Sequence, residues 1–405
     1  MVTRIYPLKN PVQDYAWGSK TAIQELLGQP FPSDTPAAEL WLGAHPKAPS
    51  EVQVADRWIT LDRLIQKDPA AILGKPVAEK YDGKLPFLMK VLAAEQPLSI
   101  QVHPNLDQAR KGFERENRLG LPLDAPERNY RDANHKPECL CALTQFEALK
   151  GFRPVEEIVR LLDRLSLAFF SDVLKTLAER PDPSGLKRFF SWWMNMDAGP
   201  RAKAVTQVVK AAESVLGGMR ETFWMKAFNR RYPGDAGVLG PVFFNLMELA
   251  PGKAVYIPAG EPHAYLKGVG VEIMANSDNV IRGGLTSKPM DVPELLHLIA
   301  CRPGPPLRVE VRDEGEERIY LTPAREFALS TLFILPGKPF KSGKARGAEI
   351  LLCTAGHGAL IDKGNNETIP MHKGASVVVP AAVSDYRIEG EATFFRATVK
   401  VSWRV

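Results

Sequence analysis

A block of helical periodicity, set between two parts of a different texture, is the feature that most constrains the fold. Within residues 154–230, apolar residues recur at spacings of three and four, which places them on one face of a helix. The first of these residues are Val155, Ile158, Val159, Leu162 and Leu165. The spacing continues through Asp172–Leu177 and Ala202–Leu216. We interpret the block as a helical insertion, and we expect Trp192 and Trp193 to pack in its core rather than line a pocket.

The flanking parts are typical of a β protein. Their apolar runs are short and are broken by Pro, Gly and polar clusters, as at Leu85–Leu92 and Pro97–Val102. Frequent punctuation of this kind favours an all-β sandwich or barrel. The fold class is therefore mainly β with a helical insertion. We expect helices near Thr21–Leu27 and Trp58–Lys67, a surface helix followed by a loop in residues 106–129, and a strand at Val242–Glu248.

A glycine turn, a β-branched strand and a second turn precede His263 in the stretch P-G-K-A-V-Y-I-P-A-G-E-P-H-A-Y. This order is typical of one arm of a double-stranded β-helix, the cupin type of jelly roll. Residues 374–390 match residues 252–268 at a shift of 122 positions, with Asp385 in the place of His263 and Arg387 in the place of Tyr265. We infer a second, degenerate C-terminal jelly roll that has lost its metal-binding arm.

These patterns divide the chain into three predicted domains. Residues 1–153 and 231–295 form a catalytic cupin domain, residues 154–230 form the helical insertion domain, and residues 296–405 form the C-terminal jelly-roll domain.

Composition and charge argue against several classes of partner. The 405 residues carry 52 Lys and Arg against 47 Asp and Glu, a net charge of +5, with no basic block that contains aromatic residues. We therefore expect no nucleic-acid partner. The chain has no apolar run long enough to span a membrane and no signal-peptide core at its start. Four scattered cysteines do not form a disulfide framework, so we expect reduced thiols in a cytoplasmic protein.

The stretch Tyr130–Glu138, Y-R-D-A-N-H-K-P-E, is unusually dense in groups that titrate or coordinate. Pro137 fixes its own φ and favours an extended conformation at Lys136. Alternate residues of an extended segment share a face, so Lys136 and Glu138 should project the same way. The alternative for this stretch alone is a charged turn with a solvated Lys–Glu pair.

Four residues are candidate metal ligands on chemical grounds. Gln101 and His103 lie two apart on a predicted strand and so face the same side. With Glu138 and His263 they provide two imidazoles, a carboxylate and an amide oxygen. Zinc accepts nitrogen and oxygen ligands and keeps a position open in catalytic sites, but a set without thiolates also suits manganese or cobalt.

Three separated stretches together resemble the type I mannose-6-phosphate isomerases, also called phosphomannose isomerases, of the cupin superfamily. They are Q-V-H-P at Gln101–Pro104, the stretch Tyr130–Glu138, and His263–Lys288, which contains H-A-Y, E-I-M-A-N-S-D-N and R-G-G-L-T-S-K. The last stretch has Gly283 where the family usually has Ala and Ser287 where it usually has Pro. Shorter matches at W-G-S, A-E-L-W and L-P-F-L-M-K-V-L extend the resemblance over most of the first 290 residues.

The resemblance implies a metal-dependent isomerase that interconverts mannose 6-phosphate and fructose 6-phosphate through a cis-enediol(ate). It implies one Zn²⁺ per chain, held by Gln101, His103, Glu138 and His263. By resemblance and by chemistry, we expect Arg282 and Lys136 to act as catalytic cations and Glu272 as the candidate base. Substrate-binding candidates are Ser99, Lys90 and Lys288 for the phosphate and Tyr265 and Asp278 for sugar hydroxyls. We expect His45 and His135 to lie outside the ligand set.

Two other functions compete with this interpretation. A cupin oxygenase with Fe(II) needs two histidines and one carboxylate with open positions, and a fourth ligand at Gln101 argues against it. A sugar-phosphate-binding protein on a retained scaffold is the second, since fold alone does not give function. A site without catalytic activity is disfavoured, because the sequence keeps Lys136, Glu272 and Arg282 beside the predicted ligands. Nothing in this sequence resembles a nucleotidyltransferase domain, so we expect a stand-alone, monomeric isomerase that supplies GDP-mannose biosynthesis.

Overall fold

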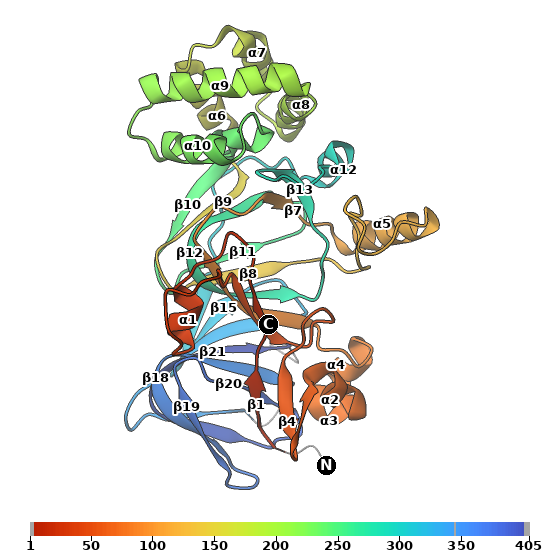
Figure 1. Cartoon of the computed structure of the whole chain (residues 1–405), viewed down its shortest axis with the longest axis vertical. Helices are drawn as coiled ribbons and strands as arrows, with labels where there is room; N and C mark the ends of the chain where they lie inside the picture. Colours follow the sequence, from red (N-terminus) through yellow and green to blue (C-terminus); the bar gives the residue numbers. More distant parts are fainter. Residues whose placement is uncertain (1–3, 344–345, 401–405) are drawn as a thin grey trace.

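Two antiparallel sheets and a helical unit make up the fold (Figure 1). The computed structural model describes residues 4–343 and 346–400. The helical unit lies at one end, the first sheet lies in the middle, and the second sheet lies at the other end. No helix within these described ranges is long and apolar enough to cross a membrane.

The first sheet has ten strands and carries the motifs. Its main path is β10 (Phe244–Leu249), β9 (Phe146–Phe152), β12 (His263–Ala275), β6 (Phe87–Ala94), β3 (Glu39–Gly43) and β2 (Val12–Gln13), with β7 (Ile100–Val102), β8 (Glu138–Ala142), β11 (Ala254–Ile257) and β13 (Ile281–Gly284) attached. The long strand β12 pairs with β6, β7, β8 and β9, so it holds the sheet together.

The second sheet has eleven strands and includes the N-terminal part of the chain. Its path is β14 (Glu310–Glu314), β15 (Glu317–Leu321), β16 (Ala328–Ile334), β21 (Tyr386–Thr398), β18 (Glu349–Asp362), β20 (Ser376–Val379), β1 (Tyr6–Lys9), β4 (Glu51–Val54) and β5 (Arg57–Thr60), with β17 (Phe340–Lys341) and β19 (Thr368–His372) attached. Tyr6 pairs with Val378, which joins the two ends of the sequence in one sheet.

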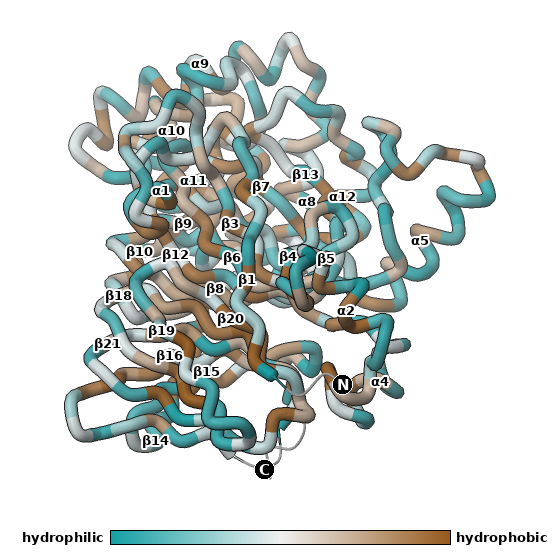
Figure 2. The backbone as a smooth tube through the Cα atoms, turned by 60° about the horizontal axis from the view of Figure 1, so that its bottom comes forward, coloured by the Kyte–Doolittle hydropathy of each residue, from teal (hydrophilic) through white to brown (hydrophobic). Residues whose placement is uncertain are grey.

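The helices fall into two groups, those outside the helical unit and those in or next to it. Those outside the helical unit are α1 (Ala22–Leu26), α2 (Leu61–Lys67), α3 (Pro69–Leu73), α4 (Lys75–Lys80), α5 (Leu106–Arg118) and α12 (Val292–Leu298). Those in or next to it are α6 (Val155–Arg164), the 3₁₀ helix η1 (Ala168–Phe170), α7 (Ser171–Glu179), α8 (Pro183–Met194), α9 (Ala198–Val215), α10 (Arg220–Arg231), the 3₁₀ helix η2 (Ala236–Leu239) and α11 (Gly240–Phe243). Helix α5 starts with a capping box between Asn105 and Gln108. In Figure 2, α5 is mostly hydrophilic, whereas central strands such as β8 are hydrophobic.

Two predicted elements differ from the structure. The expected helix at Trp58–Lys67 begins only at Leu61, because Trp58, Ile59 and Thr60 pair with β4 as a strand. The expected strand at Val242–Glu248 begins at Phe244, because Gly240–Phe243, with Pro241 in the first turn, form the short helix α11. In both places the chain changes from one element to the next within a single apolar run.

Two strands of the first sheet recur in the second sheet at a spacing of 122 residues. Strand β11 becomes β20 at this shift, and β12 becomes β21 to within one residue. Glycines before and within the repeated strands keep their backbone angles: φ is +79° at Gly252 and +89° at Gly374, and it is +126° at Gly268 and +122° at Gly390. Only glycine adopts such angles readily, which explains why these positions match in the sequence.

Trp193 anchors the helical unit. Its ring is fully buried, and its indole N–H donates to the Ala236 carbonyl at 3.0 Å. We expect Trp193→Ala to lower the free energy of unfolding by about 3–5 kcal/mol, because it removes a large buried side chain and leaves a cavity. Denaturant unfolding measures the change. Phe223→Ala in the same unit is the control, since Phe223 is exposed and should cost less than about 1 kcal/mol. Equal losses for both variants would contradict the assignment.

Candidate metal centre and active-site cavity

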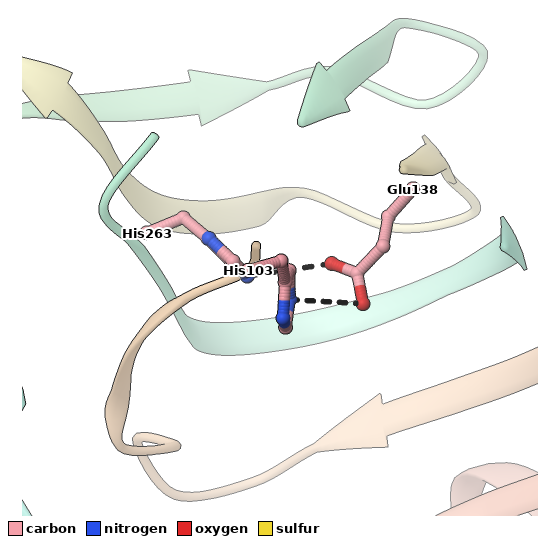
Figure 3. Close-up of side chains that lie close together, drawn as sticks. All are labelled: His103, Glu138 and His263. Atoms are coloured by element: carbon pink, nitrogen blue, oxygen red, sulfur yellow. Dashed lines mark ion pairs between the residues drawn. The ribbon is translucent and has the colours of Figure 1, made fainter. Parts of the chain in front are cut away.

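Three buried side chains converge from three strands of the first sheet. Glu138 is the first residue of β8, His263 is the first residue of β12, and His103 follows β7. Their ligand atoms all lie within 4.8 Å of one another. The carboxylate faces both rings from one side, with 3.4 Å from His103 Nε2 to Oε1 and 3.3 Å from His263 Nε2 to Oε2 (Figure 3).

Backbone carbonyls set the orientation of both imidazoles. His103 Nδ1 lies 2.8 Å from the Asn279 carbonyl, and His263 Nδ1 lies 3.1 Å from the Glu261 carbonyl. Since a carbonyl can only accept, each Nδ1 carries the proton when its ring is neutral. The Nε2 lone pairs then point toward the carboxylate of Glu138.

This arrangement fits a cation between the three side chains. Burial, opposed by Glu138, lowers the pKa of His103 to about 4, so the ring is neutral at pH 7. Burial opposes ionisation of Glu138, but nearby positive charge, first that of Lys136, holds the pKa of this carboxyl well below its usual range. His103 Nε2 is buried without a hydrogen-bond partner. Two imidazole nitrogens and a carboxylate form a zinc-type donor set, and the carbonyl partners are typical of metal-binding histidines.

The two sequence motifs meet behind this centre through Asn279. Its side chain is fully buried, accepts from the Arg131 and Asp132 backbone N–H groups at 2.7 and 3.2 Å, and donates to the Asp132 and Asn134 carbonyls at 2.8 Å each. Because its own carbonyl meets His103, Asn279 ties the segment before Glu138 to a ligand. The sequence showed both motifs but not this connection.

A cavity of about 520 Å³ opens beside the three residues. All predicted catalytic and substrate-binding residues line it, and so do Gln101, Glu138 and His263, whereas the lining does not include His103. Gln101 pairs with His263 across the strands and donates to Ser99 at 3.4 Å. The structure therefore brings the fourth predicted ligand next to the centre.

The floor of the cavity is a buried row of alternating charges. Lys90 Nζ lies 3.5 Å from Glu39 Oε1 and 3.7 Å from Glu272 Oε2. Trp41 donates to Glu39 at 2.7 Å, and Tyr265 donates to Glu272 at 2.8 Å. Burial, together with the charge of Glu138, raises the pKa of Glu272 to about 7. The row therefore holds a carboxyl that can gain or lose a proton near neutral pH.

The rim of the cavity is cationic. Within residues 4–343 and 346–400, four basic side chains of the lining form no ion pair, namely Arg131, Arg231, Arg282 and Lys288. Burial, with a contribution from Arg131, lowers the pKa of Arg282, and Arg282, burial and Arg131 lower the pKa of Lys288. Cations that repel one another without counter-charges form a site that favours an anion.

The remaining predicted residues lie near the centre in different ways. Lys136 Nζ is 3.1 Å from Glu138 Oε1, and Asp278 accepts from Lys47 at 2.9 Å. His45 is buried 3.7 Å from Asp278. His135 turns away from the cavity and meets Glu326 at 2.9 Å. Several lining residues have no role predicted from the sequence, namely Tyr15, Trp17, Glu39, Trp41, Lys47, Arg131, Arg231 and Tyr232.

Some of these residues lie within the sequence motifs quoted above, and others lie outside any motif. Trp17, Glu39 and Trp41 belong to the quoted W-G-S and A-E-L-W matches, which could have marked them. Arg231 and Tyr232 come from the end of α10 in the helical unit and carry no motif, so only the fold brings them to the cavity.

The fold and this centre define a β-sheet protein with a buried metal-binding cluster in an ionic cavity. The family model for the type I phosphomannose isomerase catalytic domain matches residues 5–155, and the model for the mannose-6-phosphate isomerase cupin domain matches residues 319–399. Mannose-6-phosphate isomerase from Escherichia coli K12 is 40% identical over 397 residues, covering 97% of this chain and 99% of the relative. The human enzyme of that name is 34% identical over 410 residues, covering 93% and 94%.

Solved structures of phosphomannose isomerases are similar to this chain over nearly its whole length. A variant of phosphomannose isomerase from Salmonella typhimurium has a TM-score of 0.92 at 38% identity, covering 98% of this chain and 100% of that one. A zinc-bound mannose 6-phosphate isomerase has a TM-score of 0.91 with the same identity and coverage. The chain therefore belongs to the type I phosphomannose isomerase family, as the sequence motifs predicted.

The raised pKa of Glu272 makes the stability of the metal-free protein depend on pH. Between the ordinary value of 4.5 and about 7, the folded carboxyl holds a proton that the unfolded chain has lost. Its contribution to the free energy of unfolding should therefore fall as pH rises through this window, by up to about 3 kcal/mol. Urea unfolding at several pH values should show wild type losing stability relative to Glu272→Gln as pH rises toward 7, because the glutamine side chain cannot ionise.

Glu95→Gln is the matched control, since the Glu95 side chain is 58% exposed. It should leave the pH profile of stability unchanged. Parallel profiles for wild type and Glu272→Gln would show that Glu272 ionises at its ordinary pKa.

Proposed function

We propose that this chain is a zinc-dependent isomerase that interconverts mannose 6-phosphate and fructose 6-phosphate. The observation that carries the proposal is the convergence of two imidazole nitrogens on one buried carboxylate, beside a carboxyl with a pKa near neutrality. The names of the relatives and the zinc-bound structure support the substrate and the metal.

We assign the metal to His103, Glu138 and His263, with Gln101 as the fourth ligand and one ion per chain. When bound, zinc would supply a Lewis acid that stabilises negative charge on the substrate oxygens. Lys136 places a second positive charge 3.1 Å from the carboxylate of Glu138. It therefore adds to the field at the same oxygens.

The chemistry requires a proton to leave C2 of the aldose and to arrive at C1. We propose that Glu272, as the carboxylate, takes the C2 proton. The electron pair of the broken C2–H bond forms the C1=C2 double bond of the cis-enediol(ate), and the π electrons of the C1 carbonyl move to O1. The same group then returns a proton to C1, while a proton passes between O1 and O2. Tyr265 and Lys90 hold the two oxygens of Glu272, so its position is fixed from both sides.

The substrate phosphate belongs, in this proposal, at the cationic rim with Arg282 and Lys288. We give Lys90 a different role from the phosphate contact suggested by resemblance, because two carboxylates already neutralise it. Ser99 is then left to bind the edge of the phosphate, and Asp278 to bind sugar hydroxyls. Arg282 lies in β13 opposite Gln101, so its charge can reach both the phosphate and the sugar oxygens.

We further propose that the second sheet is a degenerate jelly roll without metal ligands. The 122-residue repeat of elements supports this, as does Asp385 in the place of His263. The domain boundaries, the monomeric state, the cytoplasmic location and the link to GDP-mannose biosynthesis stay predictions.

Chelation tests the function directly. We expect isomerisation of mannose 6-phosphate that disappears when a chelator removes the metal and returns with zinc, because the substrate oxygens lose their Lewis acid. A coupled assay for fructose 6-phosphate measures it. Full activity without metal would contradict the roles of the four ligands. Bound metal with no isomerisation would favour a binding protein or an oxygenase.

Arg282→Ala tests the cationic rim. We expect turnover to fall by about 10²–10³-fold, because a charge positioned at the reacting oxygens is lost, while bound zinc stays near one per chain. Steady-state kinetics and metal analysis check both parts. Arg302→Ala is the control, since Arg302 is exposed and outside the cavity lining. An Arg282→Ala enzyme with wild-type turnover would refute this role.

A further inference from the structure

A buried ion pair lies behind one of the metal-binding histidines. Lys150 in β9 is only 3% exposed, and its ammonium group lies 2.6 Å from Glu261 Oε1. Glu261 is the residue two before His263. A buried ammonium group is costly in free energy unless a partner neutralises it. A charged pair at this buried position therefore suggests a role beyond packing.

The backbone next to Lys150 leaves room for the Glu261 carboxylate. Gly151 has φ of +60°, and a Cβ at this position would lie 2.8 Å from Glu261 Oε1. A side chain at Gly151 would therefore force the Glu261 carboxylate to shift from this position, and it would also strain the backbone. The side-chain amide of Asn245 donates to the carbonyls of Lys150, Gly151 and Phe152 at 3.1, 3.3 and 3.1 Å, which holds the bend in place.

The same turn fixes His263. The Glu261 carbonyl accepts from His263 Nδ1 at 3.1 Å, and the Gly151 N–H donates to the Pro262 carbonyl at 2.8 Å. His263 and Lys150 also face each other across β12 and β9. The side chain of Glu261 is thus anchored on Lys150 while its backbone carbonyl selects the tautomer of the imidazole.

We propose that Lys150 and Glu261 are a positioning pair that fixes the orientation and tautomer of His263 and thereby sets the affinity for zinc. The inference rests on the proposed zinc centre. Groups that orient a metal ligand from behind typically contribute 10–100-fold to metal affinity. Loss of one partner also leaves the other charge buried and unpaired, which should displace the turn.

The test is a thermodynamic cycle on zinc affinity, measured by competition with a chelator of known affinity. We expect Lys150→Met and Glu261→Ala each to weaken zinc binding by about 10–100-fold. The double variant should be no weaker than the poorer single variant, because the two residues act as one unit. Glu261→Gln should keep most of the affinity, since its amide oxygen can still accept from Lys150.

The visible spectrum of the cobalt-loaded protein gives a second readout, because it reports ligand geometry. It should change in Lys150→Met and Glu261→Ala and stay unchanged in the control pair. That control is Lys226→Met and Glu213→Ala, which break a 2.5 Å ion pair that is 44% exposed on each side. If Lys150→Met does not fold, Glu261→Ala and Glu261→Gln still test the proposal.

Single variants that lose stability but bind zinc within twofold of wild type, with unchanged cobalt spectra, would overturn the inference. They would show that the pair only stabilises the fold. A wild-type protein that binds zinc at this centre but does not isomerise mannose 6-phosphate would refute the proposed function and leave the inference intact. A wild-type protein that binds no zinc would refute both.

Discussion

The structure depends on two imidazole nitrogens that face one buried carboxylate. Carbonyl groups hold the protons of His103 and His263 on the far side of each ring, so both lone pairs point at Glu138. Three acceptors this close repel one another unless a cation lies between them. The surrounding sheet supplies the rigidity, because β12 pairs with the strands that lead to or carry the other two residues.

The floor and the rim of the cavity differ in how their charged side chains are paired. At the floor, each cation has a carboxylate partner, and burial leaves Glu272 poised between its two protonation states. At the rim, Arg282 and Lys288 repel each other and have no carboxylate partner, so an anion would bind there favourably. A sugar phosphate matches this division, since its reacting carbons are neutral and its charge sits at the far end. The helical unit contributes to the rim through Arg231, which gives it a place in the site.

The sequence predicted the parts of the molecule that local chemistry determines. Helical periodicity predicted the helices of residues 154–230, and the motifs contain the three residues that the structure brings together at the centre. Long-range pairing was not predictable: nothing near Tyr6 indicates that it joins β20, and nothing near Asn279 indicates that its carbonyl orients His103. The strand at Trp58 was missed because its apolar run continues directly into α2. Contacts between distant segments depend on the whole fold, and one sequence carries no local signal for them.

X-ray absorption at the zinc edge tests the metal centre most directly. For the zinc-loaded protein we predict a first shell of nitrogen and oxygen only, at about 2.0–2.2 Å, with the outer-shell scattering of two imidazoles. The cysteines are all buried away from this set, so they should contribute no scattering. A sulfur shell at about 2.3 Å, or a shell without imidazole, would contradict the central assignment.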